Sequence, residues 1–158
     1  MPIDRNELRR VMGHFATGVT VITTIAKNGQ RHGLTANSFT SVSLDPPLVL
    51  ICVDKKAESY ACFEDSKVFT INILNDSQEA LSRKFAVSGT DKFAGVAFHA
   101  GANGVPILDG VLAYIECTLY ATYDGGDHTL HLGEVQQVET VEGKPLLFYR
   151  GGYRSISD

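Results

Sequence analysis

Apolar residues recur with helical spacing in the first segment of the chain. Between residues 8 and 15 they stand at positions i, i+3, i+4 and i+7, which is the repeat of one helix face. Asp4 precedes this run and Glu7 follows three residues later, the spacing of a capping box. The pattern predicts an amphipathic helix whose apolar stripe packs against a core. The stripe consists of Leu8, Val11, Met12 and Phe15.

Apolar runs rich in β-branched residues fill much of the remaining chain and predict strands. Asn28-Gly29, the dipeptide of a tight hairpin turn, separates the first two runs. An Asp-Gly-Gly-Asp segment at 124–127 supplies a turn between the two longest runs. The predicted strands span residues 19–26, 31–34, 48–53, 68–74, 112–123, 130–141 and 145–149.

Two further short helices are predicted among these strands. One covers residues 59–64, and the other opens where Asp76 and Glu79 repeat the capping-box spacing, with an apolar face ending in Phe85. Residues 88–110 contain five glycines and one proline, and we expect them to be irregular. Six or seven strands joined by hairpin-type connections favour a mainly β, antiparallel barrel or sandwich over a parallel sheet.

Composition narrows the class of protein. The 158 residues carry 14 Lys and Arg against 18 Asp and Glu, a net charge of −4, which argues against a nucleic-acid partner. No apolar run approaches the ~18 residues of a membrane span, and the charged start of the chain lacks the apolar region of a signal peptide. We therefore expect one domain over residues 1–158, located in the cytoplasm.

The motifs that are missing exclude several kinds of site. The chain has no GxGxxG, GxxxxGK[ST], HExxH or GxSxG motif. This argues against a Rossmann dinucleotide site, a P-loop, a zincin metal site and a hydrolase nucleophile. Cys52, Cys62 and Cys117 are odd in number and widely spaced, which excludes a disulfide framework and a CxxC motif. His128 and His131 are three apart on a predicted strand, so they point to opposite faces. We expect no metal site.

Three polar segments remain as candidate chemistry. The first, 35–38, combines small, hydroxyl and amide side chains that suit close approach by a planar heterocycle, although a solvent-facing strand would look the same. The second, 82–85, places Arg83 and Lys84 beside an aromatic ring and suits a phosphate, although a solvated basic helix face is the commoner explanation. The third, 126–129, delivers His128 from a turn, where it could stack or donate a hydrogen bond or simply be a turn residue.

The order of these segments resembles the short-chain flavin reductase family. The chain runs through TGVTVITT, GLTANSFTSVSLDPPLVLICV, LSRKFA, GDHTLHLGEV and PLLFYRGGY, and the resemblance covers nearly all of it. Members of this family are the reductase components of two-component flavin-dependent monooxygenases, and the phenol hydroxylase and 4-hydroxyphenylacetate hydroxylase reductases are the most similar types. The resemblance implies an FMN-binding split barrel that passes hydride from NADH or NADPH to FAD or FMN and serves a separate oxygenase.

The resemblance also implies roles for individual residues. Four residues would meet the flavin ring and ribityl chain: Thr35, Ala36, Asn37 and Ser38, with Cys52 and Val53 close by. The phosphate end would be surrounded by Asp54, Lys55, Ser59, Lys84 and Phe85. His128 would sit at the nicotinamide as the catalytic residue, and the side around it would be closed by Tyr149, Arg150, Gly151, Gly152 and Tyr153.

The small number of ionisable groups among these residues is consistent with hydride transfer between two cofactors. Hydride transfer needs no protein nucleophile, because the cofactors carry the chemistry and the protein aligns them. Negative charge that grows on the flavin during reduction is suitably stabilised by main-chain N–H groups of segment 35–38. One small barrel offers little concave surface for two nucleotides, so we expect a homodimer with the site at the two-fold interface.

Two alternative functions stay open at this point. In the first, the protein is a flavin-binding split-barrel oxidoreductase that acts on another small acceptor molecule. The other is a non-catalytic module that stores or senses a flavin or haem, and it would bind a chromophore without oxidising reduced nicotinamide.

Overall fold

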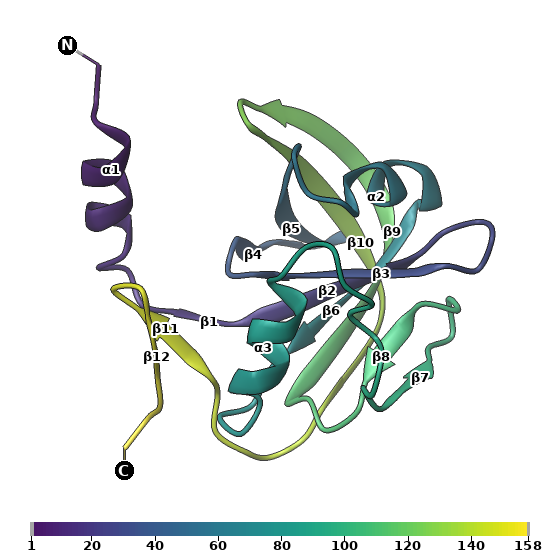
Figure 1. The fold of residues 1–158 in the computed structure, drawn as a ribbon. Coiled ribbons are helices and arrows are strands. Elements are labelled where there is room, and N and C mark those ends of the chain that lie inside the picture. The colour runs from purple at the N-terminus through teal and green to yellow at the C-terminus, as the bar shows by residue number, and fades with distance from the viewer. Residues whose placement is uncertain (1, 158) are drawn as a thin grey trace.

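A seven-stranded antiparallel sheet forms the centre of the computed structural model, which describes residues 2–157 (Figure 1). The strand order is β3-β2-β6-β9-β10-β5-β4, and every pairing within it is antiparallel. The strands are β2 (Thr20–Ile25), β3 (Arg31–Ala36), β4 (Phe39–Leu44), β5 (Pro47–Asp54), β6 (Val68–Ile73), β9 (Ala113–Gly125) and β10 (His128–Thr140). The predicted mainly β, antiparallel class is confirmed.

The two edge strands of this sheet, β3 and β4, follow one another in the chain and meet at residues 37–38. Ser38 Oγ donates to the carbonyl of Cys52 at 2.9 Å, and the Cys52 N–H donates to the carbonyl of Ser38 at 3.2 Å. The sheet therefore curls back on itself. β5 lies between β10 and β4, as its doubly apolar sequence predicted.

Three helices and two small sheets complete the described part of the chain. The helices are α1 (Arg5–Met12), α2 (Tyr60–Ser66) and α3 (Glu79–Phe85). One small sheet has the order β1-β11-β12, formed by Thr17–Gly18, Leu147–Tyr149 and Gly152–Arg154, and the other pairs β7 (Phe98–Ala100) with β8 (Pro106–Leu108). No helix within residues 2–157 is long and apolar enough to cross a membrane.

Two apolar clusters hold the sheet together. The first includes Phe63 of α2 and Phe69 of β6, which meet edge to face at 6.5 Å between ring centroids. The second includes Leu74, Phe85 and Leu146, so it joins α3 to the C-terminal segment. α2 and α3 are thus fixed to the sheet by buried aromatic rings, and the segments that precede them are held in place.

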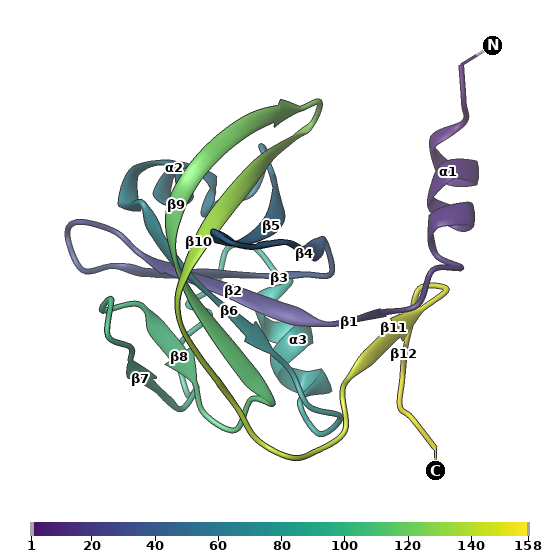
Figure 2. The same cartoon turned by 180° about the vertical axis from the view of Figure 1, so that it is seen from behind.

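The first helix forms where it was predicted, but its expected packing is wrong. The Asp4 side chain accepts hydrogen bonds from the N–H groups of Asn6 and Glu7 at 2.9 and 3.0 Å and caps α1. No residue of α1 is buried, and Phe15 beyond its end is 75% exposed. Figures 1 and 2 show α1 projecting away from the central sheet, beyond the β1-β11-β12 sheet. The apolar stripe therefore has no core to face within one chain.

Two other expectations were also wrong. Asp76 does not cap α3, because the helix begins later, with Gln78 at the cap position and no side-chain cap hydrogen bond. The stretch 88–110 was expected to be irregular throughout, yet β7 and β8 form a hairpin inside it. Asn72 fixes this hairpin to the sheet, since its Oδ1 accepts from the Leu108 N–H at 2.9 Å.

Packing in the sheet predicts the cost of one substitution. A Cβ at Gly133 of β10 would lie 2.6 Å from Phe69 Cζ and 2.9 Å from Cys117 Cβ, inside a packed core. Overpacking of this kind costs about 1–3 kcal/mol, so Gly133→Ala should lower the free energy of unfolding by that amount in urea titrations. Gly18→Ala is the matched control, because nothing lies within 4 Å of its added Cβ. Equal stability of the two variants would contradict this packing.

Candidate functional site

Segment 35–38 lies along the free edge of the curled sheet. β3 has a sheet neighbour on one side only, so half of its main-chain N–H and C=O groups point away from the ladder. The Thr35 hydroxyl donates to the Ser82 carbonyl at 2.6 Å and ties this edge to α3. Asn37 is exposed at the passage into β4, beside the Ser38 to Cys52 hydrogen bonds. The structure therefore brings the first predicted segment together with Cys52.

Cys52 is half-buried, and burial raises the pKa of its thiol. A thiol that stays protonated is a poor nucleophile. The side chain is a half-buried, small thiol beside segment 35–38.

His128 stands at the tip of the long β9–β10 hairpin, on the same sheet as Cys52. The register pairs His128 with Asp54 and Leu130 with Cys52, so the imidazole is two residues along the ladder from the thiol. His128 Nδ1 lies 2.8 Å from Asp127 Oδ1, and this hydrogen bond lowers the pKa of the Asp127 carboxyl. An ionised carboxylate at Nδ1 holds a proton there, so Nε2 is the ring nitrogen without the proton.

Lys55 contacts the tip of this hairpin. Its ammonium is 2.5 Å from Asp124 Oδ1, and its main-chain N–H donates to the Asp127 carbonyl at 3.0 Å. The hydrogen bond raises the pKa of Lys55 and lowers that of Asp124. Asp54 is equally local, since its Oδ1 accepts from the Lys56 N–H at 2.9 Å. These two residues, predicted at the phosphate end, lie at the His128 end of the sheet in one chain.

A cavity of about 740 Å³ opens beside the other end of β3. Ser59, at the start of α2, lines it and is 3% exposed, and its Oγ has no hydrogen-bond partner. Lys92 also lines the cavity, and its ammonium donates to the carbonyls of Gly33 and Phe85, both at 3.0 Å. Burial lowers the pKa of Lys92. A buried hydroxyl without a partner and a desolvated ammonium suit a phosphorylated ligand.

The other predicted phosphate residues differ in their placement. The Lys84 ammonium donates to the Ala94 carbonyl, beside the loop that carries Lys92. Phe85 is fully buried, and a Cβ at Gly33 would lie 2.8 Å from its ring. Lys84 is therefore near the cavity, whereas the Phe85 ring shapes the path of β3 from inside the core.

The C-terminal residues lie away from His128 within one chain. Tyr149 meets His14 edge to face at 6.3 Å, and the Tyr153 hydroxyl is 2.7 Å from Ser82 Oγ. Arg150 and Gly151 form the left-handed turn between them, with φ of 51° and 75°. Gly152 follows in β12. Figures 1 and 2 place this sheet and the β9–β10 tip at different ends of the molecule.

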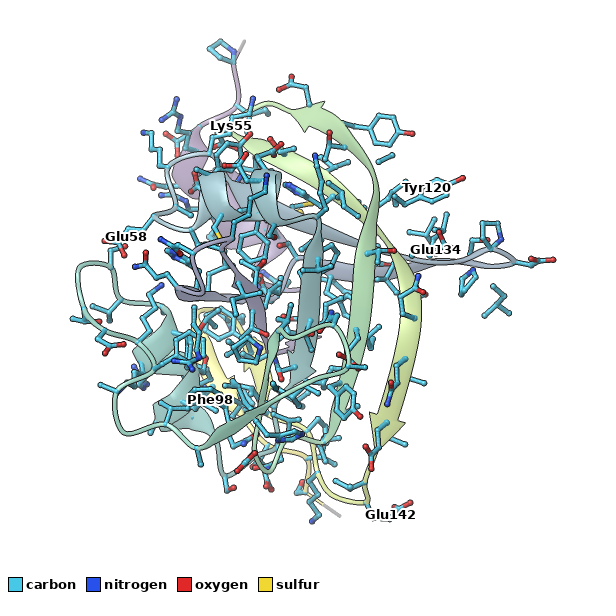
Figure 3. The ribbon with its side chains drawn as sticks, turned by 90° about the vertical axis from the view of Figure 1, so that its right-hand side faces the viewer. Lys55, Glu58, Phe98, Tyr120, Glu134 and Glu142 are labelled. Atoms are coloured by element: carbon cyan, nitrogen blue, oxygen red, sulfur yellow. The ribbon has the colours of Figure 1, made fainter. Side chains whose placement is uncertain are left out.

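Sequence reasoning missed most of the cavity lining. His32, Glu58, Lys92 and Phe93 come from three segments far apart in the chain. Glu58 accepts from the Gly89 N–H at 2.8 Å and lies on the same side of the molecule as that loop (Figure 3). None of these residues stands in a recognisable motif, so only the folded chain brings them together. Within residues 2–157, no three His, Cys, Asp or Glu side chains gather at a possible metal site.

Comparisons with known proteins point to one family. Residues 12–157 match the model of the flavin reductase like domain. The chain is 44% identical over 155 residues to the reductase subunit HsaB of a flavin-dependent monooxygenase of Rhodococcus jostii, covering 98% of this chain and 79% of that protein. It is 42% identical over 151 residues to an NADH-dependent flavin reductase of a Rhodococcus species, covering 94% and 85%.

A solved structure agrees with these sequences. The NADH:FAD oxidoreductase SgcE6 of Streptomyces globisporus, in complex with NAD and FAD fragments, superposes with a TM-score of 0.93 at 42% identity. The match covers 98% of this chain and 93% of that one.

Proposed function

The chain belongs to the flavin reductase like domain family, and on this premise we propose how its residues serve the reaction. It is an NAD(P)H:flavin oxidoreductase that passes hydride from reduced nicotinamide to FAD or FMN and supplies reduced flavin to a monooxygenase. The observation that carries the site proposal is the continuous edge of β3, which joins segment 35–38 beside Cys52 to the Ser59 cavity.

The flavin ring and ribityl chain are proposed to lie along Thr35, Ala36, Asn37 and Ser38. A bound flavin supplies the redox chemistry by accepting hydride. The residues of this chain contribute position, because the outward N–H groups of the β3 edge can donate to polar atoms of the ring. Cys52 and Val53 of the neighbouring strand give this end of the site a small apolar surface.

The phosphate end is proposed to lie at Ser59. Its buried, unpartnered Oγ can donate to a phosphate oxygen, and this is how the residues present fit a phosphorylated cofactor. Lys84 adds positive charge nearby from α3, while Phe85 keeps the strand in place from the core.

His128 is proposed to contact the nicotinamide of the hydride donor. Asp127 fixes the tautomer through Nδ1, so Nε2 presents the same chemistry to each incoming molecule. Asp54 and Lys55 are proposed to hold this tip in place, rather than to bind a phosphate.

Loss of the ion pair between Lys55 and Asp124, here called the Lys55 latch, should raise the KM for NADH. Lys55→Met removes the contact with Asp124 but keeps the length of the side chain, and the tip that carries His128 becomes less ordered. Because both charges are exposed, the KM for NADH should rise by no more than about fivefold, with unchanged flavin affinity. Steady-state kinetics at saturating flavin measures this. Lys56→Met is the matched control, and an equal rise in both variants would contradict the latch.

The working unit is proposed to be a homodimer that serves a separate oxygenase component. The exposed apolar stripe of α1 needs a covering surface, and Val42 and Leu44 on β4 are also exposed, Leu44 by 97%. The segment from Tyr149 to Tyr153 is far from His128 in one chain, so we propose that it closes the nicotinamide side of a partner's site. A surface shared in this way makes the dimer necessary for activity.

A cytoplasmic location is also proposed. Cys52, Cys62 and Cys117 are all free thiols, which suits a reducing compartment.

The proposed function is tested by a matrix of two flavins against two nicotinamides. Purified chain is mixed with FAD or FMN and with NADH or NADPH, and the reduced-nicotinamide absorbance is followed. We expect flavin-dependent oxidation with at least one donor, and the pattern gives the preferred pair. If a flavin binds but no donor is oxidised, the chain is a binding module and the proposal fails.

A further inference from the structure

Two polar contacts join α2 to the first residues of β10. His131 is fully buried, and its Nε2 lies 3.1 Å from Glu64 Oε1 on α2. One turn earlier on the helix, the Tyr60 hydroxyl is 2.8 Å from Thr129 Oγ1. Residues four apart on a helix share one face, as do residues two apart on a strand, so the two contacts lie side by side. The two contacts together are here called the α2 clamp.

The buried imidazole fixes one position of α2 on the sheet. Burial of a polar ring costs free energy unless its nitrogens find partners. The second nitrogen, His131 Nδ1, lies 3.3 Å from the Thr129 carbonyl, and the Phe63 ring meets the imidazole edge to face at 6.5 Å between centroids. A shift of α2 along β10 would leave His131 Nε2 buried without Glu64. The hydrogen bond therefore favours one register of helix and strand, which apolar packing alone does not specify.

The α2 clamp connects the two ends of the proposed site. Ser59, the proposed phosphate residue, directly precedes Tyr60 at the start of α2, and its carbonyl accepts from the Phe63 N–H at 3.1 Å. His128, the proposed nicotinamide residue, directly precedes Thr129 on β10. A movement of α2 relative to β10 would therefore change the separation of Ser59 and His128.

We propose that Glu64 and His131 are positioning residues, which hold Ser59 and His128 at the separation that hydride transfer requires. The proposal rests on the proposed function, because it uses the roles assigned there to Ser59 and His128. His131 is fully buried, so it acts through β10 and not by contact with a cofactor. Hydride transfer needs the reacting atoms about 3–3.5 Å apart, and a misplacement of about 1 Å can lower the rate by about 100-fold.

Loss of the clamp should slow hydride transfer and leave the binding of each cofactor nearly unchanged. Glu64→Leu removes the hydrogen bond to His131 and keeps a side chain of similar size. The first-order rate constant for reduction of the bound flavin, measured by anaerobic stopped flow at saturating NADH, should fall by about tenfold or more. The Kd of the flavin and the NADH concentration at half-maximal rate should each change by less than about threefold. This rate constant does not depend on the folded fraction of the sample.

Two further variants examine the same clamp. Glu64→Gln keeps a group that can hydrogen-bond to His131 Nε2, so its rate constant should stay within about threefold of that of the unmodified chain. Tyr60→Phe removes only the contact with Thr129, and its rate constant should fall by about threefold.

Ser66→Ala is the matched control. Ser66 is also on α2, but its Oγ lies 2.7 Å from Thr24 Oγ1 on β2, so the substitution loosens the same helix without a change at β10. The rate constant of this variant should equal that of the unmodified chain.

Three results would overturn the proposal. An unchanged rate constant in Glu64→Leu would show that the pair positions nothing, and an equal fall in Glu64→Leu and Ser66→Ala would show a general loosening of α2. A loss confined to flavin affinity would assign the pair to binding. Each of these results leaves the proposed function standing if the unmodified chain reduces flavin, whereas an unmodified chain that reduces no flavin would remove the proposed function itself.

Discussion

V11E and F15E introduced together should convert the proposed homodimer to single chains and lower flavin-dependent NADH oxidation by about 100-fold or more. The proposed shared site would be lost, because the substitutions place charges at an apolar contact. Both side chains are exposed in one chain, Val11 by 53% and Phe15 by 75%, so the substitutions cost the single chain little. Sedimentation velocity reports the assembly state, and steady-state assays report the rate.

The matched control for this pair is Asn6→Glu. It adds a carboxylate to the opposite, polar face of α1 and should leave both the assembly state and the rate unchanged. If the V11E/F15E chain became monomeric but remained fully active, each chain would hold a complete site, and the shared arrangement would be refuted.

His128→Ala is expected to lower kcat/KM for NADH by about 30- to 100-fold, the loss of a hydrogen bond to a polar or charged group in a closed site. Flavin affinity should change by less than about threefold, because His128 stands at the hairpin tip and not along segment 35–38 or at Ser59. Two measurements are needed: a flavin titration by fluorescence, and the initial rate against donor concentration.

His99→Ala is the control for that substitution. His99 is also exposed and also places Nδ1 2.9 Å from an aspartate, Asp109, but on the β7–β8 hairpin. His99→Ala should keep the flavin affinity and the kcat/KM for NADH of the unmodified chain. Equal loss of flavin affinity and donor use in His128→Ala would mean that His128 has a different role.

Local sequence patterns predicted most elements of this fold. Asn28-Gly29 and the 124–127 segment carry their turn chemistry within a few residues, so both hairpins formed where expected. Asp76 was wrongly predicted to cap α3, because the spacing of a capping box also occurs where no helix begins. At this point of the chain the Asn75 side chain accepts a hydrogen bond from the Ser77 N–H at 2.8 Å. The β7–β8 hairpin was missed because strands this short show no period.

The candidate site was only partly predictable from the sequence, because some of its residues are far apart in the chain. Segment 35–38 and His128 could be proposed from the sequence because each candidate lies within one local segment. The contact of Lys55 with Asp124 was not predicted, because the two residues lie 69 positions apart and a basic residue near a phosphate segment looks the same in sequence whichever way it points. The cavity residues are separated in the same way. The α1 stripe has the pattern of a helix face that packs on a core, although no residue of α1 is buried in this chain.

Anaerobic reduction of excess FAD is the most direct test of the central claim, that this chain reduces flavin for use elsewhere. A small amount of chain is mixed with FAD in large molar excess and with NADH in the absence of oxygen, and the visible absorbance of the flavin is followed. We predict that all of the FAD is bleached, at a rate proportional to the chain concentration. Bleaching that stops at one flavin per chain, or no bleaching at all, would contradict the claim.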